Sequence, residues 1–350
     1  MNPEPAYREY KTKEILKSAI SELGIYKLVE VSETGLIAEK SVTKEEPFLI
    51  LRAEMDALPL EEETGWEFAS KNGYMHACGH DFHMSAVFGA MVRTKDLRKN
   101  ILFVFQPAEE SGGGAKEIVD YIKNNYKVKA AVGFHVTDEY DFGVVASRVG
   151  VLFASAVEFD VIIEGEAAHI ALAAKGKNAL RAAVSFLDAV YRMEIPAETL
   201  LGIGKITGGV ARNIVPPLVK LEGTIRSPSV DFSMRLLEQM SCILERLKTS
   251  TGVDYQVIKG GIYPEVVVDG GLLETLKKAC ERTGLKFVEC EMKKTAEDFG
   301  YFSLRFPTLS FWFGVGDERE RVGLHNPKFL PKDEYIPRAA DLLSELVKML

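Results

Sequence analysis

The sequence predicts an α/β protein in which a domain built on a mainly parallel sheet is interrupted by a smaller α+β domain. Three short apolar runs, at 48–51, 101–105 and 130–134, alternate with helical patterns at 81–93 and 114–123. Unbroken apolar runs are typical of strands covered on both faces, and their alternation with helices favours parallel pairing. Farther along, apolar and polar residues alternate, which indicates a sheet with one exposed face. This change predicts a second domain inserted into the first.

The first domain is expected to span 1–154 and 265–350. It opens with an amphipathic helix at 10–23, where apolar residues recur at helical spacing and Gly24 stands at the place of a C-terminal cap. The doubly covered pattern returns beyond Gly270. The remaining elements expected there are a helix at 272–282, a strand at 308–313 and a closing helix at 335–350.

The inserted domain is expected to span 155–264 and to hold a small antiparallel sheet with helices. Every second residue from 157 to 163 is apolar, and a similar alternation surrounds 219–225. The other elements expected in this domain are helices at 178–191 and 234–247 and a strand at 253–258.

Length and composition limit the kind of protein. At 350 residues the chain can build two domains, each with its own core. No apolar stretch approaches the roughly 20 residues of a membrane-spanning helix and no secretory signal is recognisable, so we expect a cytoplasmic protein. A formal charge of −8 without a basic run argues against nucleic acid or an anionic membrane as partner and favours a small solute or another protein. Four scattered cysteines are too few for a disulfide framework.

The strongest local signal is the pair Cys78 and His80 in a predicted loop before a helix. Thiolate and imidazole are metal ligands of borderline softness, so the pair indicates a metal site. Taken alone, the two residues leave open a buried free cysteine beside a capping His-Asp pair. Of the neighbouring histidines, we interpret His83 as structural and leave His76 undecided.

Two adjacent carboxylates, Glu109 and Glu110, follow the second apolar run. Open α/β sheets place their sites at the carboxyl edge of the strands. One carboxylate could be held on a metal while the other takes a proton from water, and a solvated glutamate pair is the alternative. Glu54 and Asp56 follow the first run in the same way. Either could orient a ligand histidine or simply lie in a surface turn.

Two further histidines, His135 and His325, follow the third run and lie in a loop near the C-terminus. A lone histidine after a strand is more often structural than ligating, but the chain has only six histidines. With the residues above they give five possible ligands, a number that two ions sharing a bridging hydroxide could use. The five are Cys78, His80, Glu110, His135 and His325.

Eight short motifs, in order, carry a resemblance to a known family. They are Pro3-Glu4, RAEMDALP at 52–59, MHACGHD at 75–81, FQPAEE at 105–110, GFHV at 133–136, EGTIR at 222–226, AEDFG at 296–300 and GLHNP at 323–327. The chain resembles the metal-dependent aminoacylases and amidohydrolases related to carboxypeptidase G and hippurate hydrolase, and among them most resembles N-acetyldiaminopimelate deacetylases. The resemblance covers nearly the whole chain. It implies a catalytic α/β domain interrupted by a ferredoxin-like lid that forms a homodimer.

The resemblance also implies residue roles. The five possible ligands would bind two divalent ions, for which zinc, manganese, cobalt and nickel are all suitable. Glu109 would be the general base. Glu54 and Asp56 would hold the ligand side chains in position without binding the ions themselves. His169 in the lid matches a histidine that in relatives reaches the active site across a dimer and stabilises the developing oxyanion. The resemblance further implies that Asn213 and Arg226 in the lid meet the substrate carboxylate or its neighbourhood.

The expected reaction is hydrolysis of N-acetyl-L,L-diaminopimelate to L,L-diaminopimelate and acetate in lysine biosynthesis. The alternatives are a broad aminoacylase, carboxypeptidase or hippurate-type hydrolase, and a non-catalytic metal-binding homologue. Departures from the family pattern include one residue behind the site and one loop of the lid. Glu54 stands where relatives usually have aspartate, and Ala167-Ala168 precede His169 where relatives usually have two glycines, which allow more backbone freedom.

Overall fold

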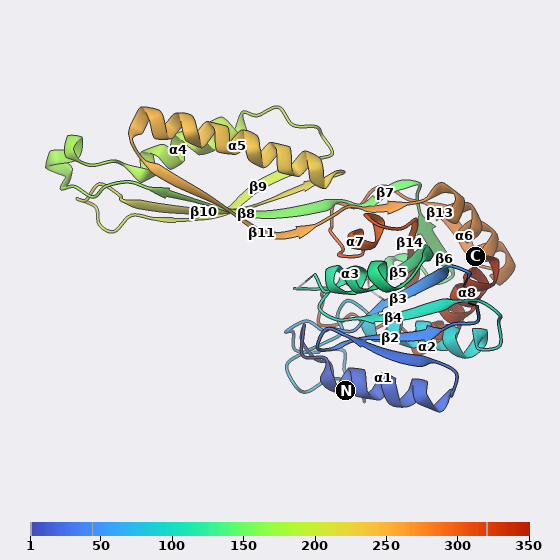
Figure 1. The fold of residues 1–350 in the computed structure, drawn as a ribbon. Helices are drawn as coiled ribbons and strands as arrows, with labels where there is room; N and C mark the ends of the chain where they lie inside the picture. Colours follow the sequence, from blue (N-terminus) through green and yellow to red (C-terminus); the bar gives the residue numbers. More distant parts are fainter. Residues whose placement is uncertain (1, 44, 112, 320) are drawn as a thin grey trace. The chain divides into compact units, whose positions relative to one another are not determined.

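The chain forms two compact units (Figure 1). The computed structural model describes residues 2–43, 45–111, 113–319 and 321–350. The first unit comprises 1–152, 266–292 and 298–350, and the second comprises 153–265 and 293–297. The second unit thus begins at 153 rather than 155 and ends at 265 rather than 264, and it also takes in a short segment that was expected in the first domain.

An eight-stranded sheet forms the centre of the first unit. Its strands, in spatial order, are β1 Lys27–Val31, β2 Gly35–Lys40, β4 Ile101–Gln106, β3 Phe48–Glu54, β5 Val128–Asp141, β14 Thr308–Gly316, β6 Val144–Ser147 and β13 Lys286–Glu289. The central strands β4, β3, β5 and β14 run parallel, whereas β1 and β2 pair antiparallel at one edge. The carboxyl ends of the central strands therefore meet at one edge of the sheet, where folds of this kind bind ligands.

Both faces of this sheet are covered at its centre. Every residue of β4 and of β14 is buried, as the unbroken apolar runs predicted. The helices of the unit are α1 Tyr10–Glu22, α2 His80–Thr94, α3 Ala115–Asn125, α6 Gly270–Thr283, α7 Gly300–Ser303 and α8 Ile336–Met349, with a 3₁₀ turn at Asp333–Tyr335. α2 packs against α8, and α3 packs against α7. Among the described residues, no helix combines the length and apolarity needed to span a membrane.

The structure adds short strands that the apolar runs did not indicate. β1, β2, β6 and β13 have four to six residues each. β7 Gly150–Phe153 and β12 Val266–Val268 form a separate two-stranded ribbon. Charged residues interrupt several of these strands, such as Glu30 in β1 and Glu39 in β2, so no unbroken apolar run marks them in the sequence.

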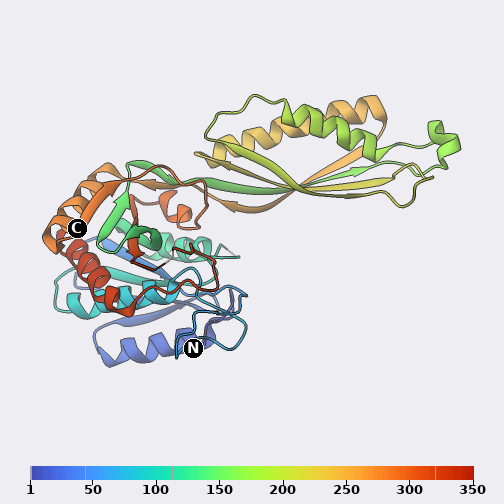
Figure 2. The ribbon, with the colours of Figure 1, turned by 180° about the vertical axis from the view of Figure 1, so that it is seen from behind.

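The second unit has the ferredoxin-like arrangement implied by the resemblance. Its elements are β8 Ser155–Glu164, the 3₁₀ segment η1 Ile170–Lys175, α4 Ala179–Tyr191, β9 Leu200–Gly208, β10 Leu218–Ser227, α5 Val230–Thr251 and β11 Asp254–Tyr263. The strands pair antiparallel in the order β11-β8-β10-β9, which with the βαββαβ sequence gives this topology. Both helices lie on the same face of the sheet (Figures 1 and 2).

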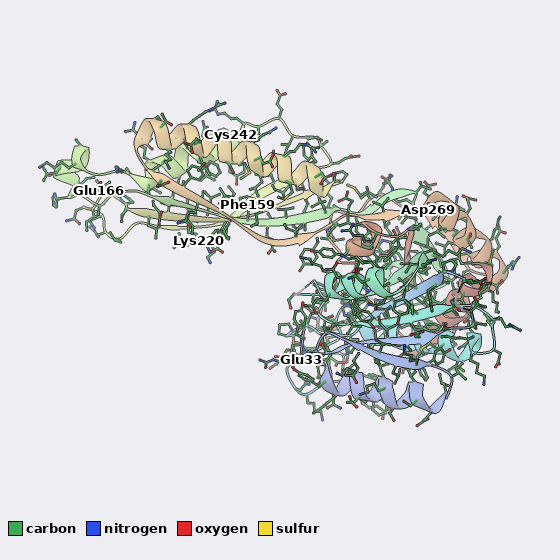
Figure 3. The ribbon with its side chains drawn as sticks, viewed as in Figure 1. Glu33, Phe159, Glu166, Lys220, Cys242 and Asp269 are labelled. Atoms are coloured by element: carbon green, nitrogen blue, oxygen red, sulfur yellow. The ribbon has the colours of Figure 1, made fainter. Side chains whose placement is uncertain are left out.

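The register of the second sheet separates its apolar and polar faces. Phe159 pairs with Gly223 and Val161 with Leu221, and these apolar side chains are buried in one cluster with Phe186 of α4. Lys220 lies on the open face, where its Nζ is 2.8 Å from the Asp160 carboxylate (Figure 3). The alternation that the sequence showed is therefore the alternation of a half-covered sheet.

Candidate metal and catalytic site

The chemically capable residues of the first unit gather at the carboxyl edge of its parallel strands. Glu54 ends β3 and Asp56 follows it, while Glu109 and Glu110 follow β4. His135 lies in the second half of β5, Cys78 and His80 stand at the start of α2, and His325 lies in the loop after β14. Parallel pairing explains the grouping, because it carries the ends of neighbouring strands to one edge.

The five possible ligands lie within a few ångströms of one another. The Cys78 Sγ atom is 3.2 Å from His135 Nε2 and 3.3 Å from His325 Nε2. Glu110 Oε1 is 3.3 Å from His325 Nε2 and 4.0 Å from His80 Nε2. Two overlapping groups, Cys78 with His80 and His135, and Cys78 with Glu110 and His325, each have ligand atoms within 4.8 Å of one another. The shared thiol makes the arrangement suitable for two ions side by side.

The protons on the histidine rings also fit a metal. His80 Nδ1 lies 2.9 Å from the carbonyl oxygen of Asp56, and His135 Nδ1 lies 2.8 Å from that of Val136. A carbonyl oxygen can only accept, so each Nδ1 donates and each Nε2 faces the cluster, where it can bind an ion once it carries no proton. Within the described part of the chain, His80 Nε2 and Glu110 Oε1 are buried without a hydrogen-bond partner. Buried polar atoms are rarely left so, and a cation would satisfy both.

The electrostatics of the cluster favour a cation. Burial alone would lower the pKa of His80, but the carboxylates of Asp56, Glu54 and Glu110 outweigh it and raise that pKa to about 10. Burial alone would raise the pKa of Glu110, but His325 and His80 outweigh it and lower that pKa to about 2. Burial raises the pKa of the Cys78 thiol, and the neighbouring glutamates raise it further. A bound divalent ion would lower the pKa of the thiol instead, because the thiolate is the form that binds the ion.

Asp56 supports both the histidine and the glutamate side of the cluster. Its carboxylate accepts the backbone N–H groups of Glu109 at 3.0 Å and Glu110 at 2.9 Å, and one of its oxygens lies 3.5 Å from His80 Nδ1. Glu109 Oε2 is thereby placed 3.9 Å from His80 Nε2. A general base needs this kind of fixed position beside the reacting atoms.

Glu54 lies behind the cluster in a buried ionic network. Its carboxylate accepts hydrogen bonds from the Arg52 guanidinium and, at 2.8 Å, from His83 Nδ1. The side chains of Arg52 and Glu54 are both buried. His83 Nε2 accepts the N–H of Val136 at 3.0 Å, so both ring nitrogens of His83 are used. These bonds agree with our interpretation of His83 as structural. Burial would raise the pKa of Glu54, but Arg52 and His83 hold it well below its usual value.

Sequence reasoning missed three members of this network, namely Arg52, Gln106 and Asp298. Arg52 donates to Asp298 at 2.7 Å and to Gln106 Oε1 at 2.8 Å, and Gln106 also donates to Asp298. The available signal was an arginine inside an otherwise apolar strand, because a buried guanidinium requires acceptors at the same depth.

The loop that carries His325 is held by Asp138 of β5, another residue that sequence reasoning missed. Asp138 accepts the N–H groups of Val322 at 2.8 Å and Gly323 at 2.9 Å. His325 donates its own N–H to the carbonyl of Ala77 at 2.9 Å and has a positive φ of 60°. His76 is not part of the ligand groups, and burial lowers its pKa.

The three lid residues expected at the site all belong to the second unit. His169 and Asn213 are exposed and lie on adjacent loops, since Ile170 N–H donates to the Asn213 carbonyl at 2.9 Å. Arg226 on β10 is half-buried, its guanidinium donates to the hydroxyl of Thr224, and burial lowers its pKa. Their participation in the chemistry stays a prediction.

The fold and the site together define a metallohydrolase with an inserted antiparallel unit. Residues 50–349 match the model of peptidase family M20/M25/M40. An N-acetyldiaminopimelate deacetylase of Bacillus cytotoxicus is 34% identical over 357 residues, covering 99% of this chain and 94% of the relative. The chain therefore belongs to the peptidase family M20/M25/M40.

Solved structures agree with this assignment. The YXEP protein of Bacillus subtilis, described as a dinuclear metal binding peptidase of the M20 family, has a TM-score of 0.85 at 27% identity, covering 99% of this chain and 93% of that one. A protein of methicillin-resistant Staphylococcus aureus, assigned as an aminohydrolase, has a TM-score of 0.92 at 24% identity over 99% and 92% of the two chains, a likeness of fold. The expected family and mixed α/β fold are confirmed, and the protein is a metal-dependent amidohydrolase.

Proposed function

We propose that the protein is a two-metal deacetylase that hydrolyses N-acetyl-L,L-diaminopimelate to L,L-diaminopimelate and acetate in the cytoplasm. The observation that carries the proposal is the cluster of one thiol, three imidazoles and one carboxylate, in which Cys78, His80 and His135 are buried, with Glu109 beside it. The choice of substrate is supported by the relative that is 34% identical along nearly all of both chains.

The ions would be held by the five clustered side chains Cys78, His80, Glu110, His135 and His325. Zinc, manganese, cobalt and nickel all suit this mixture of sulfur, nitrogen and oxygen donors. When bound, the ions supply an activated water at neutral pH and polarise the acyl carbonyl.

Glu109 would move the proton. As a carboxylate with its backbone N–H fixed by Asp56, it takes a proton from the attacking water and delivers it to the departing amine. The N–H of Glu110 also donates to Asp56, which keeps Glu110 in place beside it. Both transfers use the same oxygen atoms, so small shifts of this loop would slow both steps.

The substrate carboxylate would bind Arg226, with Asn213 nearby. A half-buried guanidinium is suited to a carboxylate, which it can bind with two parallel hydrogen bonds. His169 of a second copy would stabilise the developing oxyanion. It is exposed, and its Nδ1 accepts the N–H of Ala171 at 3.2 Å, so Nε2 carries the proton that it could donate.

A homodimer through the second unit fits the surface of that unit. Leu180, Val184 and Tyr191 form one exposed apolar stripe on α4, with 41%, 58% and 60% exposure. The edge strand β9 exposes Leu200 and Ile206 as well. Sedimentation should give the mass of two chains, and Val184→Glu should give one. Ile15→Glu, at an exposed position of α1, should leave the dimer intact.

The substrate assignment is tested by acetate or benzoate release from N-acetyl-L,L-diaminopimelate, N-acetyl-methionine and hippurate. The protein is first stripped of metal and then supplied with manganese, cobalt or zinc. We expect metal-dependent release from the diaminopimelate compound with the highest kcat/KM. Comparable kcat/KM values for all three would instead identify a broad aminoacylase, and no release from any would favour a non-catalytic homologue.

A further inference from the structure

A buried glutamate from the N-terminal segment, Glu9, contacts the loop that carries Glu109. Glu9 is completely buried, and its Oε1 accepts the N–H of Ala108 at 2.9 Å. The same oxygen accepts the N–H of Tyr7 at 3.1 Å, and Oε2 accepts the hydroxyl of Thr34 at 2.7 Å. A carboxylate is costly to bury unless donors satisfy it, and these three donors do so.

The side chain of Glu9 does not cap the helix where it stands. Glu9 occupies the N-cap position of α1, but its carboxylate makes no capping hydrogen bond there. Glu4 does that instead, because its carboxylate accepts the N–H of Thr12 at 2.9 Å and of Lys11 at 3.2 Å. Two glutamates five positions apart thus divide the work, one capping the helix and one reaching the loop after β4.

The two N–H groups bound by Glu9 Oε1 belong to residues with left-handed backbones. Tyr7 has φ 59° and Ala108 has φ 54°. Residues with a Cβ atom adopt this conformation only when the surroundings fix it. A charge-assisted bond to a buried carboxylate is a suitable restraint, and at Ala108 it fixes the residue directly before Glu109.

We infer that Glu9 is a positioning residue that holds Ala108 in its left-handed conformation and thereby aims the Glu109 carboxylate. The three consecutive N–H groups of 108, 109 and 110 are bound by two buried carboxylates, Glu9 for the first and Asp56 for the other two. The inference rests on the proposed function, in which Glu109 is the general base. Glu9 acts through the backbone and has no contact with substrate.

Two substitutions of Glu9 separate the effect of side-chain length from the effect of its charge. Glu9→Gln keeps the length of the side chain, and its amide oxygen can still accept from Ala108 and Tyr7 while its NH₂ group donates to Thr34. Glu9→Asp keeps the charge but shortens the side chain, so the bond to Ala108 is lost. With metal content verified, we expect Glu9→Asp to lower kcat about 10²-fold with little change in KM, and Glu9→Gln to retain most of kcat.

Glu4→Asp is the matched control, because it weakens the cap of the same helix without touching the loop. It should lower the Tm yet keep kcat. If kcat of Glu9→Asp matches that of Glu4→Asp, or if Glu9→Gln loses more than Glu9→Asp, the positioning role is refuted.

Hydrogen exchange of a peptide covering 105–111 gives a readout that needs no turnover. Glu9→Asp should speed exchange in this peptide while Glu4→Asp and Glu9→Gln leave it protected, and unchanged exchange in Glu9→Asp would overturn the inference. Should the wild-type protein hydrolyse none of the tested amides, the proposed function fails, while faster exchange confined to Glu9→Asp still supports the restraint on Ala108.

Discussion

The first unit buries many charged side chains beneath its candidate site, whereas the second unit, apart from Glu297 in its short segment 293–297, buries apolar side chains and hydroxyl groups. Buried charges of the first unit include Arg52, Glu54, Asp56, His80 and Asp298. From 153 to 265, by contrast, the buried polar side chains that the structure describes are Ser155, Thr199, Ser227 and Ser233.

The difference has consequences for stability. A buried charge destabilises the fold unless its partner is in place and in the right protonation state. The first unit should therefore respond to pH, metal and single charge deletions. The second unit, held by the packing of Phe159, Phe186 and Leu221, should respond mainly to changes in apolar volume.

The largest expected effect is on catalysis in the first unit. Glu109→Gln removes the group that moves the proton and should lower kcat by about 10³-fold. The five clustered ligands are untouched, so metal binding should persist. Cobalt binding can be followed by quenching of Trp312, whose ring centroid is 5.4 Å from that of His135. Full activity in the variant would remove Glu109 from its role.

Deleting a buried charge in the first unit should be far more costly than deleting an exposed one in the second. Arg52→Leu leaves Glu54 and Asp298 buried without their cation, which should destabilise the first unit by about 3–5 kcal/mol. Arg192→Leu breaks the exposed pair with Asp188 on α4 and should cost about 0.5 kcal/mol or less. Urea unfolding measures both, and equal losses would contradict the contrast between the units.

Acid should unfold the first unit before the second in metal-free protein. The folded-state pKa of Glu54 lies well below its usual 4.5, and that of Glu110 is about 2. Groups with lowered pKa values stabilise the fold above their unfolded pKa and lose that contribution as pH falls through the folded value. Stability of the first unit should thus decline from about pH 4.5 towards pH 2.

Both tryptophans, Trp66 and Trp312, lie in the first unit, so fluorescence reports on it alone, while far-UV circular dichroism reports on both units. As pH falls, the fluorescence should change first. The part of the dichroism signal that comes from the second unit should change only at lower pH. Coincident transitions would show that the two units share one response to acid.

The smallest expected effect is a difference in thiol labelling. Cys242 on α5 is exposed (Figure 3), whereas Cys280 on α6 is buried, and burial raises its pKa to about 12. Iodoacetamide at pH 8 should modify Cys242 and spare Cys280, because the thiolate is the reactive form. Peptide mapping by mass spectrometry checks this, with urea-unfolded protein as the control in which both react.

Much of this contrast could be predicted from the sequence. In the first unit, residues that can bind metal or move protons follow unbroken apolar runs, and in the second unit apolar and polar residues alternate along the strands. The runs that became β3, β4 and β5 led directly to Glu54, Glu109 and His135. Short edge strands such as β1 and β13 were missed, because charged residues such as Glu30 and Glu289 break their apolar runs.

The supporting residues were harder to find. Glu9 lies 99 positions from Ala108 and Arg52 lies 246 positions from Asp298. Only the folded chain brings such pairs together, and a carboxylate that binds a distant backbone N–H has no local pattern. Asp138 escaped notice for the same reason, because its partners are in the loop before His325.

The most direct test of a two-metal amidohydrolase is a titration of metal-free protein with manganese or cobalt, in which bound ions per chain and acetate release from N-acetyl-L,L-diaminopimelate are measured on the same samples. We predict negligible release without metal and full release when two ions are bound per chain. Undiminished release from the metal-free protein, or maximal release with no bound ion, would contradict the account.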